Sequence, residues 1–278
     1  TDTPYCIPKT VWRVFLVPDL EEVYFVYPLF PFEPEEAVIE PRQIVRPAEN
    51  FPKCCLAVFS VPIFEKIRTR PEAEKIASVS NANGEVPVYR ILHGGTPIAA
   101  YMTPIGAPAC VGTMEEVMAL GADRAVLFGS CGVLDKTIPD GAVILPRRAY
   151  RDEGTSFHYA PPSEYMEADA DLLRMAREVF DAHSVPVKAG AVWTTDAFYR
   201  ETPRRMRFFR KKGCLAVEME CAALFAMAQY RGYRFMPFLY GADNLDGESG
   251  WDARSLCEQG VSRAEVYLAC ALELCVRL

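Results

Sequence analysis

Several classes of protein are excluded by what this sequence lacks. No uninterrupted apolar run approaches the roughly 18 residues of a membrane-spanning helix, so we expect no membrane partner. No leader of basic, then apolar, then small residues opens the chain, and we therefore expect a cytoplasmic protein. Positive charge is in deficit: the net charge is −7, whereas a general nucleic-acid binder needs a basic surface. Internal repeats and low-complexity tracts are also missing.

The sequence shows no metal-binding pattern either. It holds ten cysteines, but none forms a C-x-x-C pair accompanied by a second such pair or by a set of histidines. Cysteines such as Cys54, Cys55 and Cys131 lie inside apolar runs. We therefore expect small core residues in a reducing compartment, and no metal.

What is present predicts a folded domain behind an unusual N-terminal segment. Of the 278 residues 50% are hydrophobic and 24% charged, which suits an α/β domain with an ample core. Residues 1–50 are rich in proline, which blocks long helices and central strands, and in aromatic residues, which argue against a free disordered tail. We expect residues 1–50 to form an extended arm over the domain or a neighbouring subunit, and residues 51–278 to form the domain.

Short apolar runs alternate with helical patterns along residues 51–278. Strand patterns lie at residues 55–59, 86–92, 98–102, 124–128, 142–145, 189–193, 214–217 and 235–240. Helical patterns lie at residues 64–77, 113–120, 172–180 and 221–231 and in a final segment after residue 262. Capping boxes at Thr113 with Glu116 and at Ser262 with Glu265 are expected to open two of these helices, and Gly232 to end another.

Residues 213–232, GCLAVEMECAALFAMAQYRG, join a strand to a helix, and two acids occupy the junction. Glu218 and Glu220 are two residues apart, so in an extended chain both point to the same side. Two carboxylates presented together suit a vicinal diol, because each hydroxyl must donate a hydrogen bond. Alternatively, both acids simply complement the dipole of a first helical turn.

The stretch Val217-Glu218-Met219-Glu220, followed by Cys-Ala-Ala-Leu, resembles the V-E-M-E-x-x-A-L signature of the purine nucleoside and uridine phosphorylase family. The resemblance implies that Glu218 and Glu220 hold the ribose hydroxyls and that Met219 lies under the sugar. It also places Val217 beside the base.

A second motif of the same family precedes this one. Residues 129–132, Gly-Ser-Cys-Gly, follow a strand, and glycines there let backbone N–H groups approach an anion, although strand ends use glycine in turns routinely. With the G-x-P at residues 106–108 and the L-G-A at residues 120–122, the segment is similar to the family's phosphate-binding turn. By that resemblance Gly129 and Ser130 bind phosphate.

Two further segments extend the resemblance toward the base. Residues 194–199, TTDAFY, look like the family's [ST]-x-D-x-F-Y motif, whose Phe stacks on the base, so Phe198 is the stacking candidate; a core aromatic is the alternative. Asp243 lies where the family's Asp donates a proton to purine N7, and otherwise reads as a turn cap. Arg254 lies where family members place a base-side or acid-orienting Arg.

Residues 147–156 form a dense polar segment after a strand, where ligands of α/β proteins bind. Arg151 and His158 are therefore candidates for the rim of the site, with a structural role as the alternative.

The resemblance implies a three-layer α/β/α fold with a mixed, partly barrel-like sheet, in a dimer, trimer or hexamer. It implies that a nucleoside is cleaved with phosphate to free base and ribose 1-phosphate, without any other cofactor, and Asp243 favours a purine nucleoside over a pyrimidine one. The family's phosphate-binding arginines have no counterpart: the first strand runs into residues 60–63, Ser-Val-Pro-Ile, and Leu127 lies three residues before Ser130. Either other arginines replace them, or water is the nucleophile, or the chain binds a nucleoside without turnover.

Overall fold

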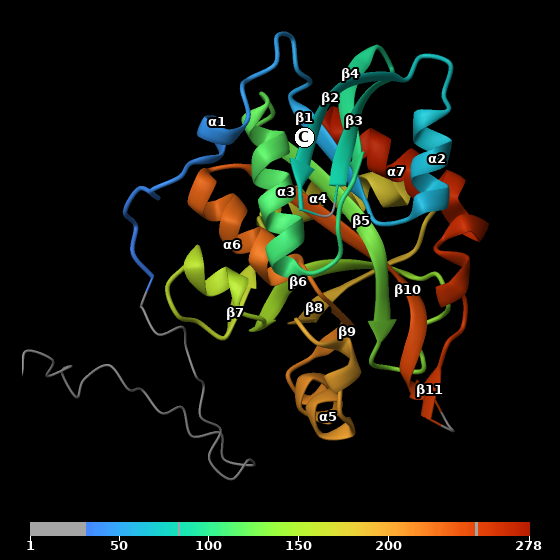
Figure 1. Ribbon diagram of the computed structural model, residues 1–278. Coiled ribbons are helices and arrows are strands. Elements are labelled where there is room, and N and C mark those ends of the chain that lie inside the picture. Colours follow the sequence, from blue (N-terminus) through green and yellow to red (C-terminus); the bar gives the residue numbers. More distant parts are fainter. Residues whose placement is uncertain (1–31, 83, 248–249) are drawn as a thin grey trace, which may run out of the picture.

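The computed structural model describes residues 32–82, 84–247 and 250–278. In this part of the chain, eleven strands form one mixed sheet with helices on both faces (Figure 1). The strands are β1 Cys54–Val58, β2 Glu74–Asn81, β3 Gly84–His93, β4 Thr96–Met102, β5 Arg124–Val133, β6 Val143–Asp152, β7 Tyr165–Glu167, β8 Val187–Thr195, β9 Cys214–Glu218, β10 Arg234–Gly247 and β11 Gly250–Asp252. The α-helices are α1 Pro41–Ile44, α2 Val61–Arg68, α3 Ala107–Ala119, α4 Ala170–Ala182, α5 Pro203–Lys211, α6 Cys221–Arg231 and α7 Ala264–Arg277. Short 3-10 turns lie at Thr155–His158, Phe198–Arg200, Leu256–Glu258 and Val261–Arg263.

The sheet divides the core into two apolar layers. Strand β1 is buried on both faces: Cys55 and Ala57 pack with α3 and α6, while Cys54, Leu56 and Val58 pack on the opposite side with α2, α4 and α7. An apolar side chain at every position of a strand is what burial on both faces requires. The three-layer α/β/α architecture that the sequence predicts is confirmed.

Five of the strands close a ring. Strand β5 pairs with β10, β10 with β6, β6 with β8, β8 with β9, and β9 again with β5. Parallel and antiparallel pairings both occur in this ring, so the mixed, partly barrel-like sheet is confirmed as well. Outside the ring, β1, β4, β3 and β2 extend the sheet from β5.

Two sequence-based boundaries are wrong in the first half of the domain. The helix expected over residues 64–77 is α2, which ends at Arg68, and residues from Glu74 onward form β2 against β3. Pro71 lies three residues beyond the end of α2, and proline disrupts a continuing helix. Helix α3 begins at Ala107 rather than at Thr113, because Gly106 at φ 94° caps it and Pro108 occupies its first turn. Thr113 is a buried residue inside that helix.

Of the two caps predicted for the later helices, one is wrong and one is confirmed. The cap of α7 is Arg263, without a side-chain capping bond, so the Ser262–Glu265 box is wrong. Helix α6 ends as expected at Gly232, whose left-handed φ of 71° suits glycine.

The two polar segments expected as loops are strands. Residues 129–132 belong to β5, and residues 147–152 belong to β6. The glycines of β5 serve close packing: a Cβ at Gly129 would lie 2.5 Å from the Phe59 ring, and one at Gly132 would lie 2.5 Å from Leu245. Substitution by alanine would force those neighbours to move.

The described part of the N-terminal arm, residues 32–50, lies along α3 and α6 (Figure 1). Tyr230 donates its hydroxyl to the carbonyl of Glu35 at 3.3 Å, and Ala48 N–H donates to the carbonyl of Leu120 at 2.8 Å. Residues 1–31 lie outside the described residues. Among the helices that are described, none combines the length and the apolar character that a membrane crossing requires.

Candidate active site

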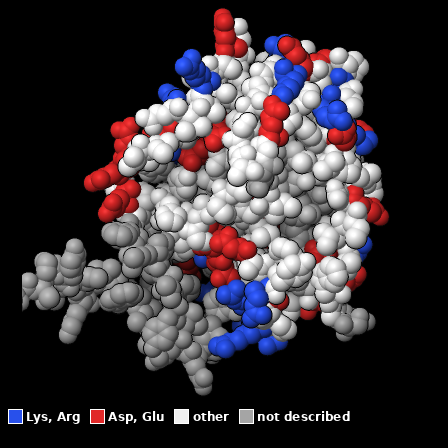
Figure 2. Space-filling model, in the orientation of Figure 1, with Lys and Arg blue, Asp and Glu red and all other residues white. Residues whose placement is uncertain are grey.

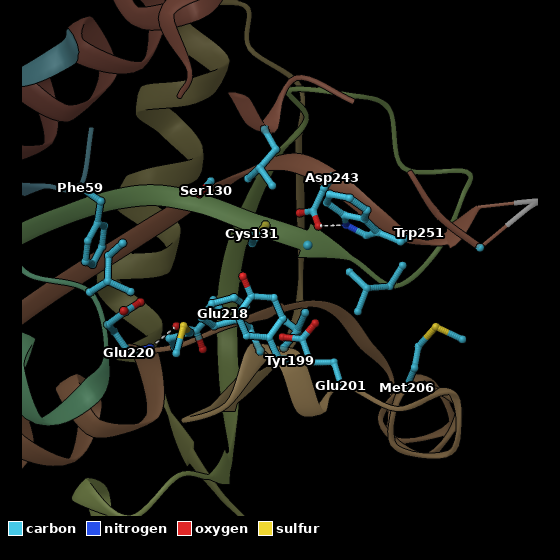
Figure 3. A pocket seen from close by; sticks show the side chains of 18 of the residues that line it. Phe59, Ser130, Cys131, Tyr199, Glu201, Met206, Glu218, Glu220, Asp243 and Trp251 are labelled. Carbon is cyan, nitrogen blue, oxygen red and sulfur yellow. Dashed lines mark hydrogen bonds between the residues drawn. The ribbon is translucent and has the colours of Figure 1, made fainter. Parts of the chain in front are cut away.

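A cavity of about 740 Å³ opens where β5, β9 and β10 end (Figure 3). These three strands come from separate parts of the chain, and the ring brings their ends together. The cavity is lined by Phe59, Ile105, Ser130, Cys131, Gly132, Phe198, Tyr199, Glu201, Pro203, Met206, Val217, Glu218, Met219, Glu220, Asp243, Leu245, Gly250, Trp251 and Leu256.

Most of the site residues predicted from the sequence line this one cavity. They are Ser130, Phe198, Val217, Glu218, Met219, Glu220 and Asp243. Gly129, Arg151, His158 and Arg254 are not among the lining residues. Residues more than 100 positions apart in sequence therefore converge on one space, as the motifs had suggested.

The Glu218 carboxylate is held mainly by protein donors. Its Oε2 accepts from the backbone N–H groups of Glu220 at 2.7 Å and Cys221 at 2.6 Å, and its Oε1 accepts from the hydroxyl of Thr194. Burial raises the pKa of Glu218, and these hydrogen bonds oppose that rise. Glu218 thus caps the first turn of α6, the alternative reading of the pair, while it also lines the cavity.

The Glu220 carboxylate accepts a hydrogen bond from a different part of the chain. Its Oε1 accepts from the backbone N–H of Gly106 at 2.7 Å. Burial, followed by repulsion from Glu218, raises the pKa of Glu220 to about 8. The two acids therefore differ in their donors. The Glu218 carboxylate accepts from the first N–H groups of α6 and from Thr194, and the Glu220 carboxylate accepts from the loop before α3.

Asp243 faces the cavity from β10. The register of β10 against β5 shifts between Gly241 and Asp243, which brings Asp243 opposite Gly132. A Cβ at position 132 would lie 3.2 Å from Oδ1 of Asp243, so glycine makes room for the carboxyl group. Burial is the main cause that raises the pKa of Asp243, and a hydrogen bond from Trp251 partly offsets it.

Two residues of this end of the cavity were missed by sequence reasoning. Trp251, on β11, donates its indole N–H to Oδ2 of Asp243 at 2.7 Å. Glu201 follows the turn at Phe198–Arg200, and burial together with the charge of Asp243 raises its pKa to about 7. Glu201 stands in a run of Arg and Lys residues at positions 200–212, and no period or motif in the sequence marks it as a cavity residue.

An aromatic wall stands at the mouth of the cavity. Phe198 and Tyr199 pack at 4.1 Å between ring centroids, and they are 51% and 88% exposed. Large aromatic rings left this open beside a cavity can be covered by a planar ligand. The alternative reading of Phe198 as a core residue is therefore wrong.

Several predicted residues lie elsewhere. Gly129 faces Phe59 within β5. Arg254 donates to the carbonyl of Ile138 at 2.9 Å, so its guanidinium is engaged outside the cavity. Arg151 is buried and donates to the carbonyls of Pro161 and Ala160 and to two serine hydroxyls, which makes it a brace of its own loop rather than part of the rim. His158 lines smaller hollows beside α3 and the N-terminal arm.

The cavity's charge is one-sided. Four carboxyl groups line it, namely Glu201, Glu218, Glu220 and Asp243, and within the described residues no Lys, Arg or His does. Helix α5 turns Pro203 and Met206 toward the cavity, while its Arg and Lys side chains are exposed. Figure 2 shows these blue side chains gathered over α5, low in the view. Over the described ranges, no group of three or more His, Cys, Asp and Glu side chains is arranged to hold a metal ion.

The fold is that of a nucleoside phosphorylase-like α/β protein. The structure superposes on a solved purine nucleoside phosphorylase from Toxoplasma gondii in complex with immucillin-H with a TM-score of 0.69. The superposition covers 83% of this chain and 94% of that one, at 20% sequence identity.

The chain belongs to the phosphorylase superfamily, whose family model matches residues 60–273. It is 28% identical to a guanosine phosphorylase of Halorubrum lacusprofundi over 55% of this chain and 63% of that protein, so the match spans less than two thirds of the relative's length. It is 29% identical to a DeoD-type purine nucleoside phosphorylase of Myxococcus xanthus over 64% of this chain and 74% of that protein. The family resemblance inferred from the V-E-M-E segment is confirmed.

Proposed function

We propose that this protein cleaves the N-glycosidic bond of a purine nucleoside with phosphate, yielding free base and ribose 1-phosphate. The observation that carries the proposal is the convergence of a buried acid pair, an aromatic wall and a third acid on one cavity. In Figure 3, Glu220 and Phe59 lie toward one end and Asp243 and Trp251 toward the other. We name these the sugar end and the base end.

At the sugar end, the ribose hydroxyls donate to the acids. Glu220 lines the cavity and accepts from the Gly106 N–H, while Glu218 fixes the corner that carries Glu220. Met219 lies between them and contacts the sugar face. As the glycosidic bond breaks, positive charge develops on the ribose, and nearby carboxylates stabilise that charge more than they stabilise the substrate.

At the base end, the leaving base collects negative charge. Protonation by Asp243 relieves that charge, and a positioned acid of this kind typically contributes about 10²- to 10⁴-fold. The raised pKa of Asp243 helps it retain a proton closer to neutral pH. Phe198 stacks on the base and orients it, with Val217 beside it. A purine fits best, because purine N7 accepts a proton and pyrimidines have no counterpart.

Phosphate is the proposed nucleophile, with Ser130 as its hydroxyl contact, and no other cofactor is invoked. The names of the relatives, guanosine phosphorylase and purine nucleoside phosphorylase, support this choice. We also propose a cytoplasmic homo-oligomer in which the arm of residues 1–50 covers the domain of residues 51–278 or a neighbouring subunit. A phosphate dianion bound beside these acids needs a cation nearby, because phosphate without an Arg or Lys partner is poorly held.

Hydrolysis of the nucleoside is a second candidate, favoured by the absence of Lys, Arg and His among the described lining residues. Water carries no charge, so it suits a cavity lined by carboxyl groups better than a phosphate dianion does.

One assay separates the candidates. The purified protein is incubated with guanosine, inosine, adenosine and uridine, with and without phosphate, and free base and sugar products are quantified. Ribose 1-phosphate formed only with phosphate supports the proposal, and free ribose formed without phosphate supports hydrolysis. Binding of a nucleoside without turnover under either condition would reduce the protein to a binding homologue.

A further inference from the structure

We propose that Trp251 is a positioning residue for the cavity's acid: its indole N–H holds Oδ2 of Asp243 and thereby assigns the transferable proton to Oδ1. The inference rests on the proposed function, since it takes Asp243 as the proton donor to the leaving base. The supporting contact joins Nε1 of Trp251 to Oδ2 of Asp243 at 2.7 Å (Figure 3).

The assignment follows from what each group can do. An indole N–H only donates, so the oxygen that it contacts must accept. A neutral carboxyl group carries its proton on one oxygen and accepts on the other. With Oδ2 accepting from Trp251, the proton resides on Oδ1, on the side of Gly132, which lines the cavity. When the proton leaves, the same indole N–H stabilises the carboxylate.

The residue expected to orient the acid does not contact it. Sequence reasoning placed an orienting Arg at Arg254, but that guanidinium donates to the carbonyl of Ile138 and lies near Asp252, at 3.7 Å between Nε and Oδ2. Trp251 takes the place instead, because β11 folds back on β10 and pairs Asn244 with Asp252. In this antiparallel register Trp251 lies opposite about position 245, so its long indole side chain reaches diagonally along β10 to the carboxyl group of Asp243.

Other charges also act on Asp243. Arg254 lowers its pKa through space and Asp252 on β11 raises it. Burial, and after it the charge of Asp243, raises the pKa of Glu201 and of the Cys131 thiol on β5. The Trp251 hydrogen bond lowers the pKa of Asp243 in addition to these effects, so loss of this hydrogen bond is expected to raise the pKa of Asp243.

The kinetic test compares wild type, Trp251→Phe, Asp243→Asn and the double variant with the best nucleoside of the panel. Trp251→Phe keeps an aromatic ring but removes the N–H. We expect kcat to fall by about tenfold and the alkaline limb of the kcat profile to move up by roughly half to one pH unit. In the Asp243→Asn background the same substitution is expected to change kcat less than about twofold, because the two residues act as one unit.

A second measurement needs no turnover. In protein carrying nitrogen-15 tryptophan, the indole N–H resonance that disappears in Trp251→Phe is followed against pH. We expect it to titrate with Asp243 in wild type and to stay flat in Asp243→Asn. If Trp251→Phe does not fold, conventional resonance assignment identifies the signal, and Asp243→Asn still decides the question.

The outcomes separate this inference from the proposed function. A titrating indole in a protein that cleaves no nucleoside leaves the Trp251–Asp243 pair intact and overturns the function. The inference is overturned if the indole N–H resonance does not shift with pH. It is also overturned if Trp251→Phe changes KM alone and leaves kcat and the pH profile unchanged. In an active enzyme, that second result would make Trp251 a packing contact of the base.

Discussion

At the sugar end of the cavity, Glu218 and Glu220 are buried and accept from backbone N–H groups, whereas at the base end Phe198, Tyr199 and Trp251 are more than half exposed. Both acids of the first end come from one strand-to-helix corner, β9 to α6, which hydrogen bonds from Thr194 and from the Gly106 N–H hold in place. The second is assembled from a turn after β8, from β10 and from β11. The sugar end is therefore preorganised by the backbone, and the base end depends on side-chain contacts such as the one between Trp251 and Asp243.

The largest effect is expected from removing the proton donor at the base end. Asp243→Asn keeps the size of the side chain but supplies no carboxyl proton, so kcat should fall by about 10²- to 10⁴-fold with a purine nucleoside. Steady-state kinetics at saturating phosphate provide the measurement. An unchanged rate would remove Asp243 from the mechanism.

The two acids of the sugar end should separate stability from catalysis. Glu220→Gln is expected to lower kcat/KM by at least about tenfold without lowering the melting temperature, because the amide oxygen can still accept from the Gly106 N–H. Glu218→Gln replaces an acceptor of backbone N–H groups and should cost about 1.5–3 kcal/mol of unfolding free energy.

Urea unfolding and steady-state kinetics are measured for both variants in parallel, so that each variant serves as the control for the other. If the two variants lose activity and stability to the same extent, the distinction between the acids is wrong.

Stability should depend on pH through Glu220. Its pKa is about 8 in the folded protein and near 4.5 in the unfolded chain, so the folded state retains a proton that the unfolded state loses between these values. The free energy of unfolding contributed by this group is therefore full below pH 4.5 and falls as pH rises toward 8, by up to about 1.4 kcal/mol per pH unit.

Urea titrations of wild type and Glu220→Gln across this range measure the dependence. The free energy of unfolding of the variant should depend less steeply on pH. An identical slope would show that Glu220 is not the group that causes the pH dependence.

The smallest effect is expected at Arg254, the counterpart of Trp251 in the sequence-based prediction. Because its guanidinium bonds the carbonyl of Ile138 rather than the acid, Arg254→Ala should change kcat by less than about threefold. The same kinetic assay checks this result. A loss as large as that of Trp251→Phe would return the orienting role to Arg254.

The contrast between the two ends also explains what the sequence could predict. The V-E-M-E corner is contiguous, so the acid pair and its place before α6 were readable from residue types alone. Phe198 and Asp243 follow recognisable strands, and their convergence required only the family resemblance. Trp251 and Glu201 were missed because a hairpin register and a 3-10 turn bring them to the cavity, and neither leaves a periodic signal.

The wrong expectations have local causes. The segments at residues 129–132 and 147–152 look like loops because of their glycine or charge content, yet the ring of strands extends through both. Arg151 looked like a rim residue because it is polar, but the carbonyls of its own loop occupy its guanidinium. The tertiary contacts that bury such groups lie far along the chain and are invisible to a local pattern.

Release of free purine by wild type and by Glu220→Gln, measured side by side at saturating phosphate, tests the central claim most directly. The account predicts base release accompanied by ribose 1-phosphate in wild type, and a loss of at least about tenfold in a variant that folds normally. Equal base release by both proteins, or none from any nucleoside by wild type, would contradict it.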